Sequence, residues 1–274
     1  MKDWRKHRLA ALPQEHGAWA FLLSPLLIGL FASPGWSADE GYLFVALLAA
    51  FFLRQPAALL AKVWSGRRPP GYRPYALFWA VVYALVALAA LGVLLRHGHT
   101  YLLWLLVPGV AVFFWHLALV AHRRERRQLG VEIVASGVLA LAAPAAYWIP
   151  YQRPQPEGWL LWLLAWLQSA ASIVYAYLRL EQRGWPAPPP VAERFRAGHR
   201  ALIYAGFNVV LALVLGLSGA LPRWVWLAFA LQFAEVLWGT WRPAVKTPPT
   251  QIGLRQMVVS AGFTALFLLA WHWG

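Results

Sequence analysis

Apolar runs of about 20 residues recur along almost the whole chain, and this feature limits most strongly how it can fold. A run of that length crosses the hydrocarbon core of a bilayer as an α-helix, because a helix satisfies its backbone hydrogen bonds internally. Only 12% of the 274 residues are charged, compared with roughly 25% in a soluble domain. The chain is therefore predicted to be an all-α integral membrane protein. No connecting segment is long enough to fold separately, so we expect a single polytopic domain over residues 1–274.

Nine membrane spans are predicted from windows of about 19 residues. They centre on residues 17–33, 42–63, 75–95, 101–121, 129–149, 158–178, 200–219, 223–241 and 253–272. The first apolar run follows a basic segment, as in a signal peptide, but Gln14, Glu15 and His16 interrupt the transition, and about 17 apolar residues exceed a usual signal core. We therefore expect this run to be the first span of the bundle.

The basic residues are divided unevenly between the two sets of connections. The N-terminal segment, the connections after spans two, four, six and eight, and the adjoining span ends hold 20 of the 24 Lys and Arg residues. The other connections hold 3, and Arg54 lies inside a span. Because cytoplasmic segments carry the excess of Lys and Arg, the N-terminus is predicted to be cytoplasmic and the C-terminus external. The net charge of +14 is thereby attributed to loops that face an anionic lipid surface, and we expect no nucleic-acid partner.

Polar residues inside the spans are costly in lipid, so each is a candidate for a functional site. Arg54 lies eight residues before Lys62, about 12 Å deeper along a helix, which makes snorkelling to the interface strained. Gln55 and Pro56 follow it, and Pro56 is expected to kink or break the helix because proline lacks the backbone donor. In the sixth span, four polar residues recur at helical spacing on a face that must look into the bundle. They are Gln168, Ser172, Tyr175 and Arg179, and Arg183 extends this face into the loop.

Three carboxylates lie within spans or at their cytoplasmic rims, in the same half of the membrane as these bases. Because opposite charges can offset desolvation by pairing, we expect a polar cavity open to the cytoplasmic side. The ligand-binding candidates are Arg54, Gln55, Lys62, Gln168, Ser172, Tyr175, Arg179 and Arg183, and the catalytic candidates are Glu15, His16, Glu132 and Glu235. The alternative interpretation is structural, with ion pairs and with helix–helix contacts made by Gln168 and Ser172.

The sequence does not indicate a metal site or a haem site. The chain has no cysteine, which excludes thiolate ligands and a disulfide framework. His16 and His116 are the candidate ligands, but no two histidines lie at a ligand spacing such as i, i+4 on one helix. We therefore expect neither a metal site nor a haem. His97, His99 and His272 are predicted to lie at the outer interface of the membrane.

The block LPQEHGAWAFLLSPLLIGL, residues 12–30, resembles the start of the YwiC-like family of bacterial membrane proteins. In that family a Pro-x-Glu-His-Gly-Ala-Trp signature precedes the first helix. The blocks LRQPAALLAK, RRERRQLGVEIVASG and QIGLRQMVVS support the resemblance, which extends over most of the chain. It implies a location in the bacterial inner membrane, and it implies no settled activity.

A looser likeness is to the UbiA-type intramembrane prenyltransferases, whose nine spans and cytoplasmic N-terminus are similar to the arrangement predicted here. Those enzymes hold a prenyl diphosphate through magnesium ions bridged by two Asp-rich motifs. In this chain no Asp or Glu occurs between Glu40 and Glu125, and the second motif position offers only Glu181. We therefore do not expect magnesium-assisted diphosphate ionisation. A cluster of guanidinium groups can bind an anionic head group directly.

The sequence thus predicts binding of an amphipathic anionic ligand, such as a lipid, a quinone or an isoprenoid, and leaves the activity open. If the protein is an enzyme, we expect a transferase acting on a lipid or isoprenoid, with Glu or His as the general base. Two alternatives are a transporter or exporter that uses the same charges and a non-catalytic assembly factor of a respiratory complex.

Overall fold

The computed structural model describes residues 2–13, 18–123 and 128–273, and within these ranges every regular element is helical. In chain order the helices are α1 (Lys2–Ala11), α2 (Ala18–Ala32), α3 (Asp39–Trp64), the short 3-10 helix η1 (Pro70–Tyr72), α4 (Arg73–Arg96), α5 (Leu102–Ala121), α6 (Leu129–Leu139), α7 (Ala142–Trp148), α8 (Pro156–Gln182), α9 (Val191–Leu217), α10 (Trp226–Trp241) and α11 (Pro249–Trp273). The predicted all-α class is confirmed.

Within the described ranges, seven helical segments are long and apolar enough to cross a membrane. They are α3, η1 with α4, α5, α6 with α7, α8, α9 and α11. The predicted spans at 17–33 and 223–241 are occupied by α2 and α10, which have only 15 and 16 residues. Helices of that length are about 22 to 24 Å long, less than the roughly 30 Å of a hydrocarbon core. The seven long helices show a multi-pass membrane protein, and nine full crossings stay a prediction.

The prolines inside α3 and α5 do not interrupt these two helices. α3 runs from Asp39 to Trp64 through Pro56, so the expected break at this proline does not occur. The helices α4 and α5 pack along α3, and packing of this kind lets a membrane helix accommodate an internal proline. Pro108 likewise lies inside α5.

The predicted span 129–149 is interrupted between α6 and α7. Pro144 lacks the N–H that would bond to the carbonyl of Ala140 in a regular helix, which favours an interruption here. The carbonyl oxygen of Gly137 accepts a hydrogen bond of 2.8 Å from Trp162 Nε1, and that of Ile133 accepts one of 2.8 Å from Trp166 Nε1. These two indoles of α8 therefore tie α6 to α8 next to the interruption.

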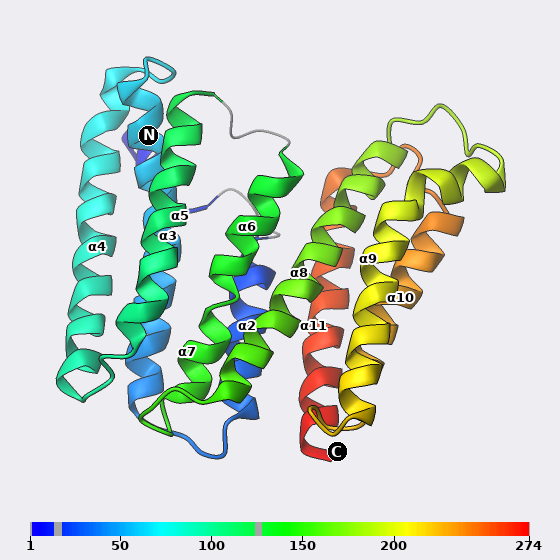
Figure 1. Cartoon of the computed structure of the whole chain (residues 1–274). Helices are drawn as coiled ribbons and strands as arrows, with labels where there is room; N and C mark the ends of the chain where they lie inside the picture. The colour runs from blue at the N-terminus through cyan, green and yellow to red at the C-terminus, as the bar shows by residue number, and fades with distance from the viewer. Residues whose placement is uncertain (1, 14–17, 124–127, 274) are drawn as a thin grey trace.

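The helices form three groups that lie side by side (Figure 1). α3, α4 and α5 pack together with α1, α9 packs on α10 and α10 on α11, and α2, α6, α7 and α8 lie between these groups. The main core is centred on the middle group, where Leu26, Trp148 and Leu164 are fully buried. α2 and α7 approach so closely that a Cβ atom at Gly29 would lie 2.2 Å from the carbonyl oxygen of Ala143. This contact requires a glycine.

The outward faces of the helices are apolar. Leu85 and Leu88 of α4 and Val107 of α5 are each more than 60% exposed. An exposed apolar surface of this extent on a long helix is suited to contact with lipid tails, which have no hydrogen-bonding groups. The fold therefore places its apolar surface where a bilayer would cover it.

The connections separate into two ends (Figure 1). α1 and the connections 65–72, 183–190 and 242–248 lie at one end, which we call the basic end because the Lys and Arg excess lies there. The connections 33–38, 97–101, 149–155 and 218–225 lie at the other, the opposite end. This arrangement places the basic segments together on one side of the bundle.

Candidate functional site

The polar face predicted on the sixth span lies inside the bundle. Gln168, Ser172, Tyr175 and Arg179 all belong to α8 and are between 1 and 6% exposed. Their spacing of three and four residues places them on one side of the helix. That side meets α10 through contacts with Gln232, Glu235 and Gly239.

The deeper half of the α8–α10 interface is a network of amides and a hydroxyl. Gln232 Nε2 donates hydrogen bonds to Ser172 Oγ at 2.8 Å and to the carbonyl oxygen of Gln168 at 3.0 Å. Gln168 Nε2 donates to the same Ser172 Oγ at 3.2 Å. Hydrogen bonds of this kind hold membrane helices together. Gln168 and Ser172 thus have helix-packing partners and do not line the cavity described below.

Glu235 is the centre of the other half of the interface. Arg255 of α11 donates to it through two hydrogen bonds, from Nε to Oε1 at 2.6 Å and from Nη2 to Oε2 at 2.7 Å. Tyr175 Oη lies 2.9 Å from Glu235 Oε1 and 3.1 Å from the backbone carbonyl oxygen of Glu235. The Arg255 guanidinium also lies 3.7 Å from the ring centroid of Trp238, a cation–π contact that fixes its orientation. Three helices therefore meet at a single carboxylate.

A glycine makes the approach of Tyr175 to α10 feasible. A Cβ atom at Gly239 would lie 1.8 Å from Tyr175 Oη and 2.7 Å from its Cζ atom. Neither distance is compatible with ordinary van der Waals contact. Gly239 is therefore part of the site because it leaves room for the tyrosine.

Arg179 is a buried guanidinium that is held by neutral acceptors. Its Nη1 atom donates to the carbonyl oxygens of Gly239 and Arg242, both at 2.7 Å, and to Gln182 Oε1 at 2.9 Å. Within the described residues its Nε and Nη2 atoms make no hydrogen bond, and no carboxylate bonds to it. A buried charge normally pairs with an opposite charge, since desolvation is otherwise uncompensated. The Nε and Nη2 edge of this guanidinium therefore has no hydrogen-bond acceptor among the described residues.

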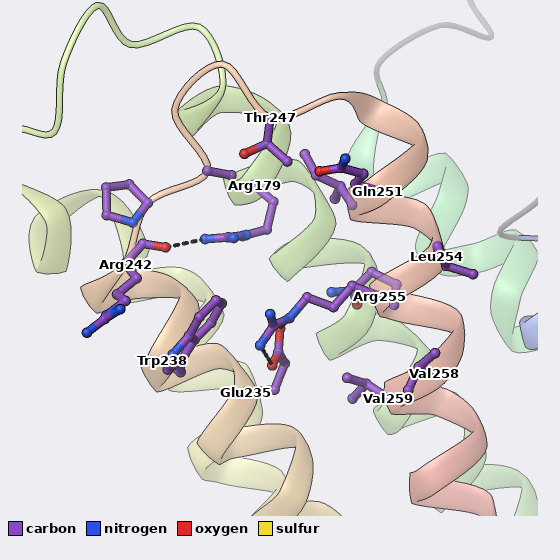
Figure 2. A pocket seen from close by; sticks show the side chains of 14 residues that line it. Arg179, Glu235, Trp238, Arg242, Thr247, Gln251, Leu254, Arg255, Val258 and Val259 are labelled. Carbon is purple, nitrogen blue, oxygen red and sulfur yellow. Dashed lines mark hydrogen bonds and ion pairs between the residues drawn. The ribbon is translucent and has the colours of Figure 1, made fainter.

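A cavity of about 690 Å³ opens beside Arg179 and Glu235 (Figure 2). This volume lies in the range of small-molecule sites, which is roughly 300 to 1,000 Å³. Its walls come from α8, α10, α11 and the connection 242–248, so it lies toward the basic end. Charged side chains line one part of the wall, and Leu254, Val258 and Val259 of α11 line another. The cavity therefore combines a polar region with an apolar one.

Two other candidates of the sequence lie near this end but outside the cavity. Arg183 is exposed, and its Nε donates to the carbonyl oxygen of Thr247 at 3.3 Å. Glu132 is exposed on α6, and its Oε1 accepts a hydrogen bond of 2.8 Å from Tyr177 Oη. Neither lines the cavity beside Arg179.

The basic candidates on α3 form a separate group. Gln55 Nε2 donates to the carbonyl oxygen of Leu9 in α1 at 2.9 Å. The Arg54 guanidinium lies 5.6 Å from the ring centroid of Phe51. Arg54, Gln55 and Lys62 do not line the cavity, because α3 packs against α1, α4 and α5. Glu15 and His16 lie outside the described residues.

The opposite end contains a cluster that the sequence did not reveal. His97 Nδ1 lies 2.6 Å from Asp39 Oδ1, and His99 Nε2 lies 2.7 Å from Asp39 Oδ2. His99 Nδ1 lies 2.7 Å from Tyr101 Oη, which donates to the carbonyl oxygen of Trp148 at 3.1 Å. The chain of contacts links the start of α3, the connection 97–101 and α7. Burial raises the pKa of the Tyr101 hydroxyl, and the Asp39 carboxylate adds to this rise.

Glu40, next to this cluster, is 5% exposed, and both of its carboxylate oxygens lack a hydrogen-bond partner among the described residues. The signal available in the sequence was the placement of Asp39, Glu40, His97 and His99 at neighbouring span ends on the same side. Histidines at the outer interface were predicted, but their shared carboxylate was not. No group of three or more His, Asp or Glu within the described part of the chain could hold a metal ion.

The long apolar helices, with a polar interface buried among them, define a multi-pass helical membrane protein. Residues 12–147 match the family model described as YwiC-like protein, and over this segment the chain belongs to the YwiC-like family. No curated protein and no solved structure matches the chain significantly. The family match ends at the last turn of α7, so α8, α10 and α11, which form the cavity, lie beyond it.

Proposed function

We propose that the protein binds, within the membrane, an amphipathic ligand whose anionic head group occupies the cavity beside Arg179. The observation that carries this proposal concerns Arg179, a residue that is 6% exposed and whose guanidinium, among the described residues, is hydrogen-bonded only to neutral acceptors. An anion on its Nε and Nη2 edge would supply the missing counter-charge through two parallel hydrogen bonds. The apolar wall of α11 would hold the ligand's tail.

The orientation proposed for the ligand follows from the position of the cavity. It lies at the basic end, where the connection 242–248 contributes Thr247 to its wall. Because Lys and Arg accumulate on the cytoplasmic side of bacterial inner-membrane proteins, we place this end in the cytoplasm, with α1 inside and the end of α11 outside. The ligand would then enter from the cytoplasmic leaflet. Leu254 and Val258 are more than 60% exposed and mark the side on which its tail would meet lipid.

Binding is the first step of each activity open to this chain, whether transfer or transport. A transferase would use Glu235 or another carboxylate as a general base. Tyr175 and Arg255 already hold Glu235 in place. The likeness to UbiA-type prenyltransferases and the role of Arg54 and Lys62 on α3 stay predictions. A lipid, a quinone and an isoprenoid remain the ligand classes to test.

Native mass spectrometry of the gently purified protein tests the proposal. Val258→Trp would fill the cavity from an exposed position without disturbing the core, since Val258 is 64% exposed and lines the wall. Val214→Trp is the matched control, because Val214 is 55% exposed on α9 and does not line the cavity. We expect a lipid-like anion to be retained by the wild type and by Val214→Trp, and to be lost from Val258→Trp. Equal retention by both variants would refute the assignment of the cavity.

A further inference from the structure

Two guanidinium groups and one carboxylate meet at the cavity, and one of the two guanidinium groups is neutralised there. Arg255 is paired with Glu235 through two hydrogen bonds of 2.6 and 2.7 Å. Within the part of the chain that the structure describes, the hydrogen-bond acceptors of Arg179 are all carbonyl and amide oxygens. Its other contacts are with the neutral rings of Tyr175 and Trp238, whose centroids lie 5.9 and 5.7 Å from the guanidinium. The buried part of the site therefore carries one positive charge in excess of its negative charge.

Arg242 does not change this balance. What it contributes is its carbonyl oxygen, which accepts a hydrogen bond of 2.7 Å from Arg179 Nη1. Its guanidinium points away from Arg179 and Arg255 (Figure 2), is exposed, and lies 5.6 Å from the ring centroid of Trp241. An exposed charge is screened by solvent and salt within about 10 Å. The charge that a buried head group meets is set by Arg179, Arg255 and Glu235.

We infer that the head group bound here carries a single negative charge, and that Glu235 sets this preference. The inference rests on the proposed function and deepens it by naming the class of ligand. A carboxylate or a phosphodiester would neutralise the one unpaired guanidinium. A phosphomonoester or a diphosphate would bring a second negative charge close to the Glu235 carboxylate, and like charges in a desolvated site repel strongly. The ligand is thus a monoanionic amphiphile, with a fatty acid and a phosphodiester lipid as its two sources.

The substitution Glu235→Gln tests this inference, because it should change which head-group charge the protein binds more tightly. Glutamine keeps the shape of the side chain and an oxygen that can accept the hydrogen bond from Tyr175. It removes the negative charge that neutralises Arg255, so the site gains a second unpaired guanidinium. The variant should then favour a dianionic head group, whereas damage to a merely structural interaction would weaken the binding of all ligands alike.

The experiment is a competition among single-chain amphiphiles added to the full-length protein in neutral detergent, measured by native mass spectrometry. The probes are hexadecanoate and hexadecyl methyl phosphate as monoanions, hexadecyl phosphate as a dianion, and hexadecanol as a neutral control. At about pH 8 hexadecyl phosphate is doubly ionised, since the second pKa of a phosphate monoester is near 6. Glu193→Gln, an exposed carboxylate in the first turn of α9, is the matched control.

The wild type and Glu193→Gln should bind one or both monoanions about tenfold more tightly than hexadecyl phosphate, because repulsion from Glu235 should offset about one charge-assisted hydrogen bond. Glu235→Gln should reverse this order. The monoanion that binds more tightly distinguishes a fatty-acid head group from a phosphodiester one.

Arg255→Gln is a second variant in case Glu235→Gln does not fold. It leaves one positive charge, on Arg179, and one negative charge, on Glu235, so the buried site has no net charge. This variant should bind anions no more tightly than hexadecanol. If the wild type binds the dianion as tightly as the monoanions, or if Glu235→Gln binds with an unchanged order, the inference is wrong while the proposed function stands. If no anion binds the wild type more tightly than hexadecanol, the proposed function itself fails.

Discussion

The contact between Gly239 and Tyr175 gives the sharpest test of the site's geometry. The substitution Gly239→Ala would place a methyl group 1.8 Å from Tyr175 Oη and 2.7 Å from Cζ. An ordinary contact needs about 3.5 Å, so the ring or α10 must move by about 1.7 Å. Such a movement separates Tyr175 from Glu235, whose Oε1 now lies 2.9 Å from the hydroxyl.

The expected loss of stability follows from three contributions. A hydrogen bond to a charged acceptor contributes about 1.5 to 3 kcal/mol, and overpacking costs about 1 to 3 kcal/mol. Alanine favours the helix over glycine by about 1 kcal/mol, which offsets part of this loss. Gly239→Ala should therefore lower the free energy of unfolding by about 1.5 to 5 kcal/mol.

The assay is the SDS-induced unfolding of the protein in mixed micelles, followed by far-UV circular dichroism. Gly253→Ala is the matched control, because a Cβ atom at Gly253 on α11 would meet no atom of the described residues within 4 Å. That variant should be as stable as the wild type or more stable by up to about 1 kcal/mol. Tyr175→Phe removes the nearest atom, so Gly239→Ala should cost less in that background. Equal unfolding midpoints for Gly239→Ala and Gly253→Ala would refute the close approach.

Further predictions concern the packing of α2 and the cluster at the opposite end. Gly29→Ala should destabilise the protein in SDS titrations by about 1 to 3 kcal/mol through overpacking against α7, whereas Gly92→Ala, whose Cβ would meet no described atom within 4 Å, should not. Asp39→Asn should lower the free energy of unfolding by about 1 to 3 kcal/mol because two imidazoles lose their charged acceptor. Glu40→Gln should leave it unchanged or raise it, since this carboxyl is buried without a partner among the described residues, and similar losses for the two variants would contradict the assigned contacts. Because the pKa of Tyr101 is raised in the folded state, its contribution to stability is complete below the unfolded-state pKa of about 10 and is lost as pH rises above it. Tyr101→Phe should therefore flatten the alkaline decline of thermal stability, and an identical decline in both proteins would exclude this role.

The sequence predicted those residues of the site that recur at helical spacing along one span. Gln168, Ser172, Tyr175 and Arg179 were predicted to share one inward face, because positions three and four apart on a helix lie on the same side. Their burial in the structure agrees with that expectation. The partners of this face could not be predicted in the same way. The bidentate contact between Glu235 and Arg255 joins two helices, and no local periodicity encodes which turn of one helix meets which turn of another.

The basic residues inside the spans were expected to meet at one cavity, and this expectation also depended on helix neighbours that the sequence does not specify. Depth in the membrane can be counted from the sequence, so Arg54 and Arg179 were both predicted to lie in spans, and the structure places them within α3 and α8. Lateral position cannot be counted, and the structure places Arg54 on α3, which packs with α1, α4 and α5, while Arg179 faces α10. The basic residues of α3 and those of α8 therefore lie in different parts of the bundle.

The sequence by itself determined that the chain is a multi-pass helical membrane protein and that its basic segments gather at one end. Both follow from the length of the apolar runs and from the distribution of Lys and Arg, which are local properties of the chain. Only the tertiary structure decided that α2 and α10 are short, that Asp39 joins His97 and His99, and that Arg179 has no anionic partner among the described residues beside its cavity. These features depend on the side-by-side packing of helices distant in the sequence, and apolar runs of similar composition do not specify their neighbours.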